Sequence, residues 1–434
     1  MSTSPTGTRR TFLQSTALAA GALAAPAIAR AAASETIRVA VIGLGAQGKA
    51  HIRSWLSHDN VELAAVCDVD EKRLAEAAAI ARDARPIEDL RTIIDDPDID
   101  AISIATPDHW HTPAALLAMD AGKHVYVEKP CSHNVREGRM LVEAAKKTGR
   151  VVQHGTQTRS SEGHQQAIQM LREGIIGDVT VARAWDVQFR GPIGKTSPGQ
   201  PPAGLNYDLW VGPAPMQPFR SNCHHYTWHW WYNFGTGDAG NDGIHELDIA
   251  RWGLGVDTQP SRVTAVGGKY VHDDDQQFPD TMTAIFEYSG DGQVGSQKQL
   301  IYEMRLWSTN YPENVDNGVE FIGTKGRMFM SKRGKFSLFG PRNTRIDQKP
   351  AGSLAGSVAA HQANFLDAIR GNAKPVADVM TAHLSASLSH LGNVATRIGG
   401  SFEFDPATDS TPDAAADRLL GREYRAGHWA APTC

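Results

Sequence analysis

The chain has 434 residues, a formal net charge of −5 and 21% charged residues. One hydrophobic core seldom fills more than roughly 250 residues, so this length favours two domains. The mildly acidic balance, with no long basic run, argues against nucleic acid as a partner and against an anionic membrane. The four cysteines follow no metal-binding or disulfide spacing, so no structural disulfide is expected.

The first 33 residues predict an export signal. Arg9 and Arg10 form a twin arginine, and an apolar run from Ser15 to Ala25 follows, with small-residue cleavage positions around Ala29. The run is too short to span a bilayer, and twin-arginine signals direct proteins that cross the membrane already folded. We therefore expect residues 1–33 to be a signal peptide read by the twin-arginine export machinery, and the mature chain to lie in the periplasm without a membrane anchor. The alternative is an Ala-rich tail with no signal function.

Short β-branched runs alternate with amphipathic stretches over residues 34–154, a pattern typical of a parallel sheet with crossover helices. Asp70 is expected to cap a helix through Ala81, and Asn134 with Glu137 resembles a capping box for a helix that stops at Gly149. The expected strands are Ile37–Ile42, Leu63–Cys67, Ala101–Ala105, His124–Val127 and Val151–His154.

A glycine-rich turn closes the first of these strands and opens a helix. Such a turn lets a pyrophosphate approach the helix N-terminus. Asp68 follows at the end of the second strand, where a carboxylate can accept the ribose hydroxyls of NAD, whereas Arg73 could reach the 2′-phosphate of NADP. Both cofactors stay open, as does a related fold that binds no cofactor. The predicted dinucleotide site consists of Gly43, Gly45, Ala46, Gln47, Gly48, Asp68 and Arg73.

The second half of the chain predicts a larger, mostly antiparallel open sheet over residues 155–350. Helices near Glu162–Arg172 and His245–Trp252 should cover one face, and Gly191–Pro218 is expected to be a long loop. Helices at His361–Arg370 and Val379–Ile398 and a C-terminal tail, within residues 351–434, should pack back on the body. The expected strands are Val179–Phe189, Arg262–Val271, Thr281–Tyr288, Gly295–Tyr302, Val319–Ile322 and Arg327–Met330.

Four segments carry a resemblance to a known family: Ala105-Thr106-Pro107-Asp108-His109-Trp110-His111, Gly122-Lys123-His124-Val125-Tyr126-Val127-Glu128-Lys129-Pro130, His361 through Arg370, and Arg422-Glu423-Tyr424. The chain resembles the glucose–fructose oxidoreductase / inositol dehydrogenase (Gfo/Idh/MocA) family over nearly all of its mature length. The resemblance implies an N-terminal NAD(P)-binding Rossmann domain and a second α/β domain whose open sheet serves oligomerisation, as a dimer or tetramer. It also implies oxidoreduction of sugars, polyols and their derivatives.

The same resemblance assigns site residues. Lys129 matches the catalytic lysine, whose ammonium group stabilises a developing alkoxide and relays a proton, and Thr106, His111 and Glu128 would line the nicotinamide pocket. The alternative for Lys129 is an ion pair with Glu128 or with a surface carboxylate.

The segment Gly237–Asp248 matches the second catalytic element of the family. Family members commonly place an aspartate four residues before a histidine. This chain has His245 but carries Asn241 at the aspartate position, and an amide cannot accept a proton. Asp242 is one residue out of register and would point elsewhere on a helix. The prediction is therefore that Lys129 and His245 form the acid/base pair while Asn241 binds substrate, the alternative being a histidine that only packs a helix.

The run Cys223–Tyr232 is rich in aromatic rings and imidazoles, which suits a wall for sugar binding. Trp228 and Tyr232, together with Gln157 and Arg159, are predicted substrate contacts. Plain core packing of the rings is one alternative. A zinc or iron site is another, formed by His225, His229 and His245, although no metal is expected because a partner motif is lacking.

These observations predict an exported oxidoreductase that keeps NAD, or NADP, tightly bound, because no dinucleotide pool exists outside the inner membrane to exchange with. Hydride transfer would occur at a secondary alcohol of a sugar, glycoside or polyol. Two alternatives stay open. One is a redox-neutral glycosidase that oxidises, eliminates and reduces in one cycle, and the other is a non-catalytic periplasmic sugar-binding protein.

Overall fold

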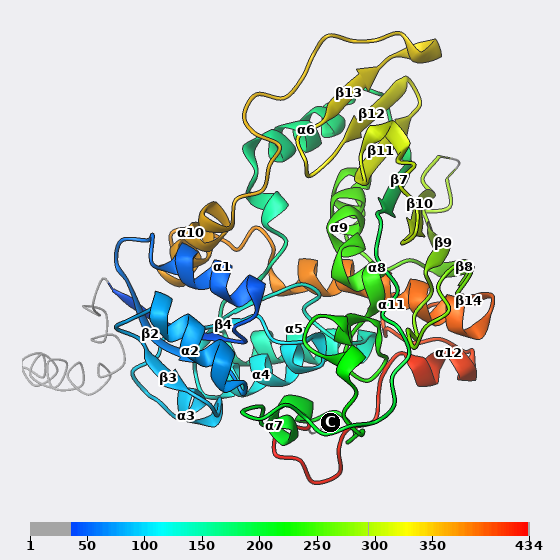
Figure 1. The fold of residues 1–434 in the computed structure, drawn as a ribbon. Helices are drawn as coiled ribbons and strands as arrows, with labels where there is room; N and C mark the ends of the chain where they lie inside the picture. The colour runs from blue at the N-terminus through cyan, green and yellow to red at the C-terminus, as the bar shows by residue number, and fades with distance from the viewer. Residues whose placement is uncertain (1–35, 294, 433–434) are drawn as a thin grey trace, which may run out of the picture.

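The computed structural model describes residues 36–293 and 295–432, so the expected signal peptide lies outside the described residues. The first domain contains a six-stranded sheet in the order β3-β2-β1-β4-β5-β6, and every paired strand is parallel (Figure 1). This is the Rossmann sheet that the sequence predicted, with one further edge strand. The strands are β1 (Ile37–Ile42), β2 (Val61–Cys67), β3 (Arg85–Ile87), β4 (Ala101–Ile104), β5 (His124–Val127) and β6 (Val152–His154).

The helix caps of this domain follow their local sequence signals. The carboxylate of Asp70 accepts a hydrogen bond from the backbone N–H of Arg73, and Asn134 accepts one from the N–H of Glu137. The helix that Asn134 caps ends at Gly149, whose φ of 66° lies in the left-handed region that glycine tolerates best. The helices are α1 (Ala46–Trp55), α2 (Glu71–Ile80), α3 (Arg91–Ile94), α4 (Asp108–Asp120) and α5 (Val135–Thr148).

The second sheet has eight strands in the order β13-β12-β11-β7-β10-β9-β8-β14, and only the β7–β10 pair is parallel. The prediction of a large, mostly antiparallel sheet is thereby confirmed. The strands are β7 (Val179–Val187), β8 (Arg262–Gly268), β9 (Thr281–Tyr288), β10 (Lys298–Arg305), β11 (Asn317–Gly323), β12 (Gly326–Met330), β13 (Phe336–Phe339) and β14 (Ser401–Glu403).

The expected strand Gly295–Tyr302 was placed three residues too early. The observed β10 buries Leu300, Tyr302 and Met304 on one face, while polar side chains such as Glu303 alternate with them. A strand with one polar face has no continuous apolar run to mark its end, and therefore the period-two alternation alone defines it.

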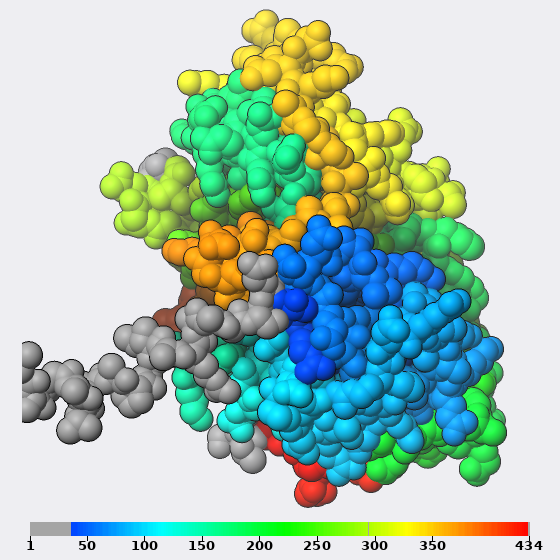
Figure 2. Space-filling view, turned by 90° about the vertical axis from the view of Figure 1, so that its left-hand side faces the viewer, coloured from blue at the N-terminus to red at the C-terminus, as the bar shows by residue number. Residues whose placement is uncertain are grey.

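Two helices from the C-terminal part of the chain pack on the domains. α11 (Val379–Ile398) lies between the domains and packs against α5, α9 (Gly243–Leu254) and β8 (Figure 1). α10 (Val358–Ile369) packs on α1, and its orange surface adjoins the blue surface of the first domain in Figure 2. The remaining helices are α6 (Glu162–Arg172), α8 (Gly237–Asn241), α12 (Ala414–Leu419) and the short 3-10 turns Gln157–Ser160, Ser221–Cys223, Thr227–Trp230, Pro312–Asn314 and Pro341–Asn343.

The expected loop Gly191–Pro218 is more ordered than predicted, because it contains α7 (Tyr207–Val211). Just before α7, Leu205 forms a β-bridge with Asp70, so the segment lies against the nucleotide-binding domain. Figure 2 shows this green segment beside the blue and cyan surface. The second domain thus extends over the edge of the first.

Two further observations concern the described part of the chain. Cys67, Cys131 and Cys223 are buried free thiols, and Cys434 lies outside the described residues. No helix among these residues combines the length and apolarity needed to cross a membrane.

Candidate functional site

A cavity of about 430 Å³ opens at the carboxyl ends of β1, β2, β4 and β5, where ligands gather in open parallel sheets. Its walls come from distant segments of the chain, including α7, the 3-10 turn Thr227–Trp230, α8 and Trp429 of the C-terminal tail. The predicted residues that line it are Gly43, Gly45, Ala46, Gln47, Asp68, Arg73, Thr106, His111, Glu128, Lys129, Trp228 and Asn241.

The glycine-rich turn has the shape that a pyrophosphate requires. Gly43 has a φ of +85°, and a Cβ on it would lie 2.5 Å from the carbonyl oxygen of Ala105. A Cβ on Gly48 would lie 1.8 Å from the carbonyl oxygen of Gly43. Because any side chain at these two positions would collide with backbone, the turn brings the unpaired N–H groups at the start of α1 to the cavity. The residues present therefore fit a dinucleotide.

Asp68 and Arg73 place opposite charges at the adenosine end of this cavity. The Asp68 carboxylate accepts hydrogen bonds from the backbone N–H groups of Leu44 (2.7 Å) and Asp70 (3.0 Å). Burial raises the pKa of Asp68, although these two backbone bonds oppose the shift. The Arg73 guanidinium lies beside Gly45, so this end retains a group for a ribose and a group for a phosphate.

Glu128, directly after β5, contacts two neighbouring side chains. Its carboxylate accepts a hydrogen bond from Gln47 Nε2 at 2.8 Å and lies 2.8 Å from His51 Nε2. Burial would raise the pKa of Glu128, yet the contact with His51 lowers it overall, so this buried group stays ionised. His111 lies nearby, with its ring nitrogens on the carbonyl oxygens of Pro130 and Thr106.

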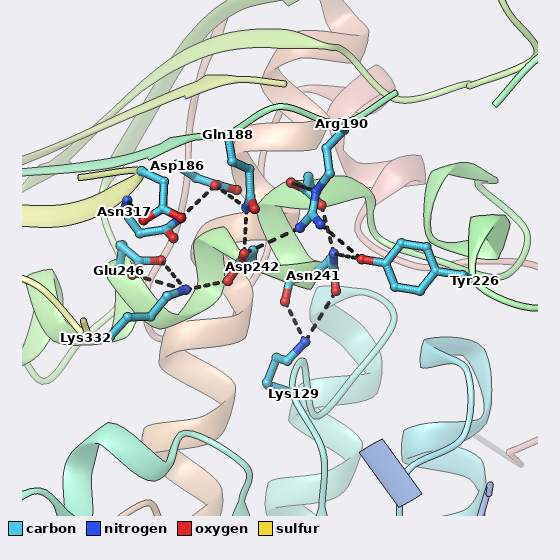
Figure 3. A network of polar contacts seen from close by, with 12 residues as sticks. Lys129, Asp186, Gln188, Arg190, Tyr226, Asn241, Asp242, Glu246, Asn317 and Lys332 are labelled. Atoms are coloured by element: carbon cyan, nitrogen blue, oxygen red, sulfur yellow. Dashed lines mark hydrogen bonds and ion pairs between the residues drawn. The ribbon is translucent and has the colours of Figure 1, made fainter. Parts of the chain in front are cut away.

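Lys129 extends from this wall toward α8. Its Nζ donates to the backbone carbonyl of Asn241 at 2.5 Å and contacts the side-chain oxygen of the same residue at 3.4 Å (Figure 3). Asn241 in turn donates to Asp238 (2.8 Å) and contacts the hydroxyl of Tyr226 (3.5 Å). The two elements predicted from separate motifs therefore meet at one point in the cavity.

His229 lines the cavity together with Lys129, as do His111 and His225. Nδ1 of His229 contacts the carbonyl oxygen of Tyr226, which can only accept, so Nδ1 carries the proton and Nε2 is left as an acceptor. Burial lowers the pKa of His229 to about 3, and the charge of Lys129 contributes to the shift. The sequence indicated His229 as part of a sugar-binding wall or as a metal ligand and not as the base, since its place in the aromatic run gave no sign of which ring faces the cavity.

The structure does not bring every predicted residue to this cavity. His245 is buried and does not line it, its Nδ1 has no hydrogen-bond partner among the described residues, and burial lowers its pKa to about 3. Arg159 forms a buried ion pair with Asp248 (2.8 Å), and Tyr232 packs against Phe278. Neither of these two residues lines the cavity, and Gln157 does not line it either.

A buried charged cluster lies on the other side of α8 (Figure 3). Asp242 binds Lys332 and accepts a hydrogen bond from Gln188 at 2.5 Å, and Lys332 also contacts Glu246. Despite its burial, Asp242 has a pKa held below the usual range by Lys332, whereas burial raises the pKa of Glu246 to about 8. Asp242 therefore forms its ion pair with Lys332 rather than taking part in a proton relay with Lys129.

The metal alternative of the sequence, His225 with His229 and His245, does not form one group. Within the described residues, the three metal-ligating side chains that lie close together are Asp70, His224 and His225 instead. Trp230 and Trp231 belong to hydrophobic cores, so part of the aromatic run is packing, as one alternative held.

Two family models match the chain. "Oxidoreductase family, NAD-binding Rossmann fold" covers residues 37–156, and "Oxidoreductase family, C-terminal alpha/beta domain" covers residues 170–430. The chain belongs to the Gfo/Idh/MocA family of oxidoreductases. The predicted family, fold class, enzyme class and NAD-binding domain are thereby confirmed.

Curated relatives are similar over different lengths. A glycosyl hydrolase family 109 protein of Saccharopolyspora erythraea is 35% identical over 156 residues, which is 34% of each chain. The matched segment thus spans about a third of the length of such relatives. Myo-inositol 2-dehydrogenase of Thermotoga maritima is 25% identical over 297 residues, 68% of this chain and 75% of the relative.

Solved structures share the whole fold. The WlbA dehydrogenase of Bordetella pertussis, in complex with NADH and UDP-GlcNAcA, has a TM-score of 0.65 at 20% identity and matches 85% of this chain and 99% of its own. Levoglucosan dehydrogenase in complex with NADH has the same TM-score at 19% identity, over 85% of this chain and 99% of its own.

Proposed function

We propose that this protein is an exported oxidoreductase that keeps NAD or NADP tightly bound and acts on a secondary alcohol of a sugar, glycoside or polyol. The observation that carries the proposal is the convergence of Lys129, Asn241 and His229 in one cavity with the dinucleotide-binding turn. The relatives named above act on or bind sugars and polyols according to their names, which supports the same substrate class for this chain.

The chain's own residues supply the proton chemistry of such a reaction. A bound dinucleotide supplies the hydride acceptor. Nε2 of His229 accepts the proton of the substrate hydroxyl, because the other ring nitrogen already holds one. Lys129 stabilises the developing alkoxide with its ammonium group, and Asn241 holds that ammonium in place through two contacts.

Tight retention of the cofactor is supported by the cover over the adenosine end. Leu209 and Trp210 of α7 and Trp429 of the tail line the cavity there. The carbonyl oxygen of Trp210 lies 3.0 Å from the indole nitrogen of Trp110, which fixes α7 on α4. These side chains would lie against a bound dinucleotide and slow its release, which suits an enzyme in the periplasm.

The open sheet supports a homo-oligomer, a dimer or a tetramer. Val266 of β8 is 66% exposed and Ile322 of β11 is 39% exposed, while the residues next to them in sequence are buried or half-buried. These side chains share the open face with ion pairs such as Arg183–Glu303 and Arg327–Glu320, so the surface that a second copy would cover is mixed apolar and charged.

The proposal is tested on protein isolated from the periplasm. Denaturation should release one equivalent of NAD or NADP, and a panel of sugars and polyols should raise the absorbance at 340 nm of the intact protein with no cofactor added. Lys129→Ala should abolish this signal while the released dinucleotide stays at one equivalent, and Lys146→Ala, at an exposed position, should behave as the wild type. Isolated protein that is empty and takes up no dinucleotide would refute the proposal.

A redox-neutral glycosidase is the second candidate, and the match to glycosyl hydrolase family 109 proteins favours it. That match is confined to about a third of each chain, so it leaves about two thirds of this chain unmatched. Aryl glycosides incubated without an acceptor separate the two functions. Release of phenol in large excess over enzyme supports the glycosidase, whereas release of at most one equivalent supports the oxidoreductase. Binding of sugar with neither signal would indicate the non-catalytic alternative.

A further inference from the structure

Asp70, His224 and His225 form a cluster at the adenosine rim of the cavity. One ligand atom from each residue lies within 4.8 Å of the others, and Nε2 of His225 is 2.8 Å from Oδ2 of Asp70. Asp70 belongs to the first domain, directly before α2, whereas the two histidines belong to the second domain between two 3-10 turns. The cluster therefore joins segments that are about 150 residues apart in sequence.

One donor atom of this cluster is unpartnered, and two others bind each other. Nε2 of His224 is buried and has no hydrogen-bond partner among the described residues. Nε2 of His225 donates to Oδ2 of Asp70, so an ion would replace this hydrogen bond, while Oδ1 of Asp70 caps α2. A neutral imidazole keeps one lone pair for an ion.

The charges that act on the two histidines nearly cancel. They are the carboxylate of Asp70 and the guanidinium of Arg73. The donor atoms, rather than the local charge, therefore favour an ion at this position.

We propose that Asp70, His224 and His225 bind one divalent transition-metal ion of the Zn²⁺ class. Two imidazoles and one carboxylate suit such an ion, while Mg²⁺ and Ca²⁺ prefer sites made of oxygen alone. Three protein ligands leave a fourth position for water. This site is separate from the chemistry proposed for Lys129 and His229, and it holds or fails independently of it.

The ion would act as a latch between the domains. Because His225 lines the cavity, fixing it to Asp70 closes the segment from Ser221 to Trp230 over the adenosine end. Release of a bound dinucleotide would then require the metal bonds to break, so removal of the metal should speed that release.

The test uses untagged, folded protein stripped with a chelator and titrated with Zn²⁺ by calorimetry and with Co²⁺ by visible absorption. One equivalent should bind, with a Co²⁺ spectrum of a four- or five-coordinate nitrogen and oxygen site. His224→Asn and His225→Asn should each weaken binding roughly 100-fold or more, because a lost ligand costs at least as much as a lost outer-shell partner. Asp70→Asn should weaken binding too while it retains a capping oxygen for α2.

His58→Asn is the matched control. His58 lies outside the cluster and follows the C-terminal end of α1, whereas the N-terminal end faces the cavity. This variant should leave metal affinity unchanged. The proposal is overturned if the wild type binds no Zn²⁺ or Co²⁺ at 100 μM, or if both histidine variants bind as the wild type does. The wild-type titration decides the matter even if a variant fails to fold.

Discussion

At the scale of single residues, the choice of base is decided by position rather than by residue type. His229 and His245 are both buried imidazoles with a pKa lowered to about 3, so their intrinsic basicity does not distinguish them. Of these two, only His229 lines the cavity with Lys129, and only its tautomer is set by a carbonyl oxygen. A base must reach the proton that it removes, and therefore geometry comes before pKa.

We expect His229→Asn to slow reduction of the bound dinucleotide by roughly 100-fold, within the usual contribution of general base catalysis. His245→Asn should have a smaller effect on this rate. Single-turnover absorbance at 340 nm measures both variants, and the melting temperature controls for folding. A larger loss in His245→Asn would return the role of base to the residue that the sequence predicted.

The buried side chain of Glu246 makes the free energy of unfolding depend on pH, and a substitution can separate this contribution from that of other groups. Burial raises its pKa from 4.5 to about 8. Between these pH values the native state holds a proton that the unfolded chain has released, so the contribution of Glu246 to the free energy of unfolding falls as pH rises.

Glu246→Gln removes this titration. The free energy of unfolding of the variant, relative to that of the wild type, should therefore rise between pH 5.5 and pH 8.5 by up to ~1.4 kcal/mol per pH unit. The difference in melting temperature between the two proteins should rise in parallel. Thermal unfolding followed by circular dichroism measures the difference. A difference that stays constant across this range contradicts the assignment of a raised pKa.

At the scale of elements, the turn between β1 and α1 depends on two glycines that backbone atoms surround. We expect Gly48→Ala to lower the free energy of unfolding by about 1–3 kcal/mol, because the added methyl group would meet the carbonyl oxygen of Gly43. The same change should empty the dinucleotide site.

Gly191→Ala provides the control for this element. The position is in open space and its φ does not lie in the left-handed region, so stability and dinucleotide content should match the wild type. Chemical denaturation and mass analysis of the released nucleotide measure both variants. Full occupancy in Gly48→Ala would show that the turn tolerates a side chain.

At the scale of the whole molecule, the cofactor site is completed by the end of the chain. Arg422 binds Glu137 of α5 at 2.7 Å, which anchors the tail and brings Trp429 onto the cavity, where Arg91 lies over its ring. The cavity is therefore lined by side chains of both the first domain and the C-terminal tail.

We expect Trp429→Ala to speed release of the dinucleotide by roughly tenfold or more, since burial of an aromatic side chain is worth ~2 kcal/mol. The melting temperature without nucleotide should change little, because the ring is half-buried at the rim. Loss of NADH fluorescence on dilution into NAD measures the release rate. An unchanged rate would mean that the tail does not cover the bound cofactor.

Local signals in the sequence determined the Rossmann domain and much of the site. The glycine turn, Asp68, the caps at Asp70 and Asn134 and the bounds of Val379–Ile398 each depend on residues that are close in sequence, and for this reason they could be read from it. The family motif around Lys129 carried the enzyme class in the same way.

Only the tertiary structure decided which distant side chains share the cavity. His229 and Trp429 line it while His245 and Arg159 do not, and α7 crosses onto the first domain through contacts more than 100 residues apart. Such pairings follow from the packing of the two domains around α11. The spacing of residues along the chain does not predict whether a given ring faces the cavity or the core.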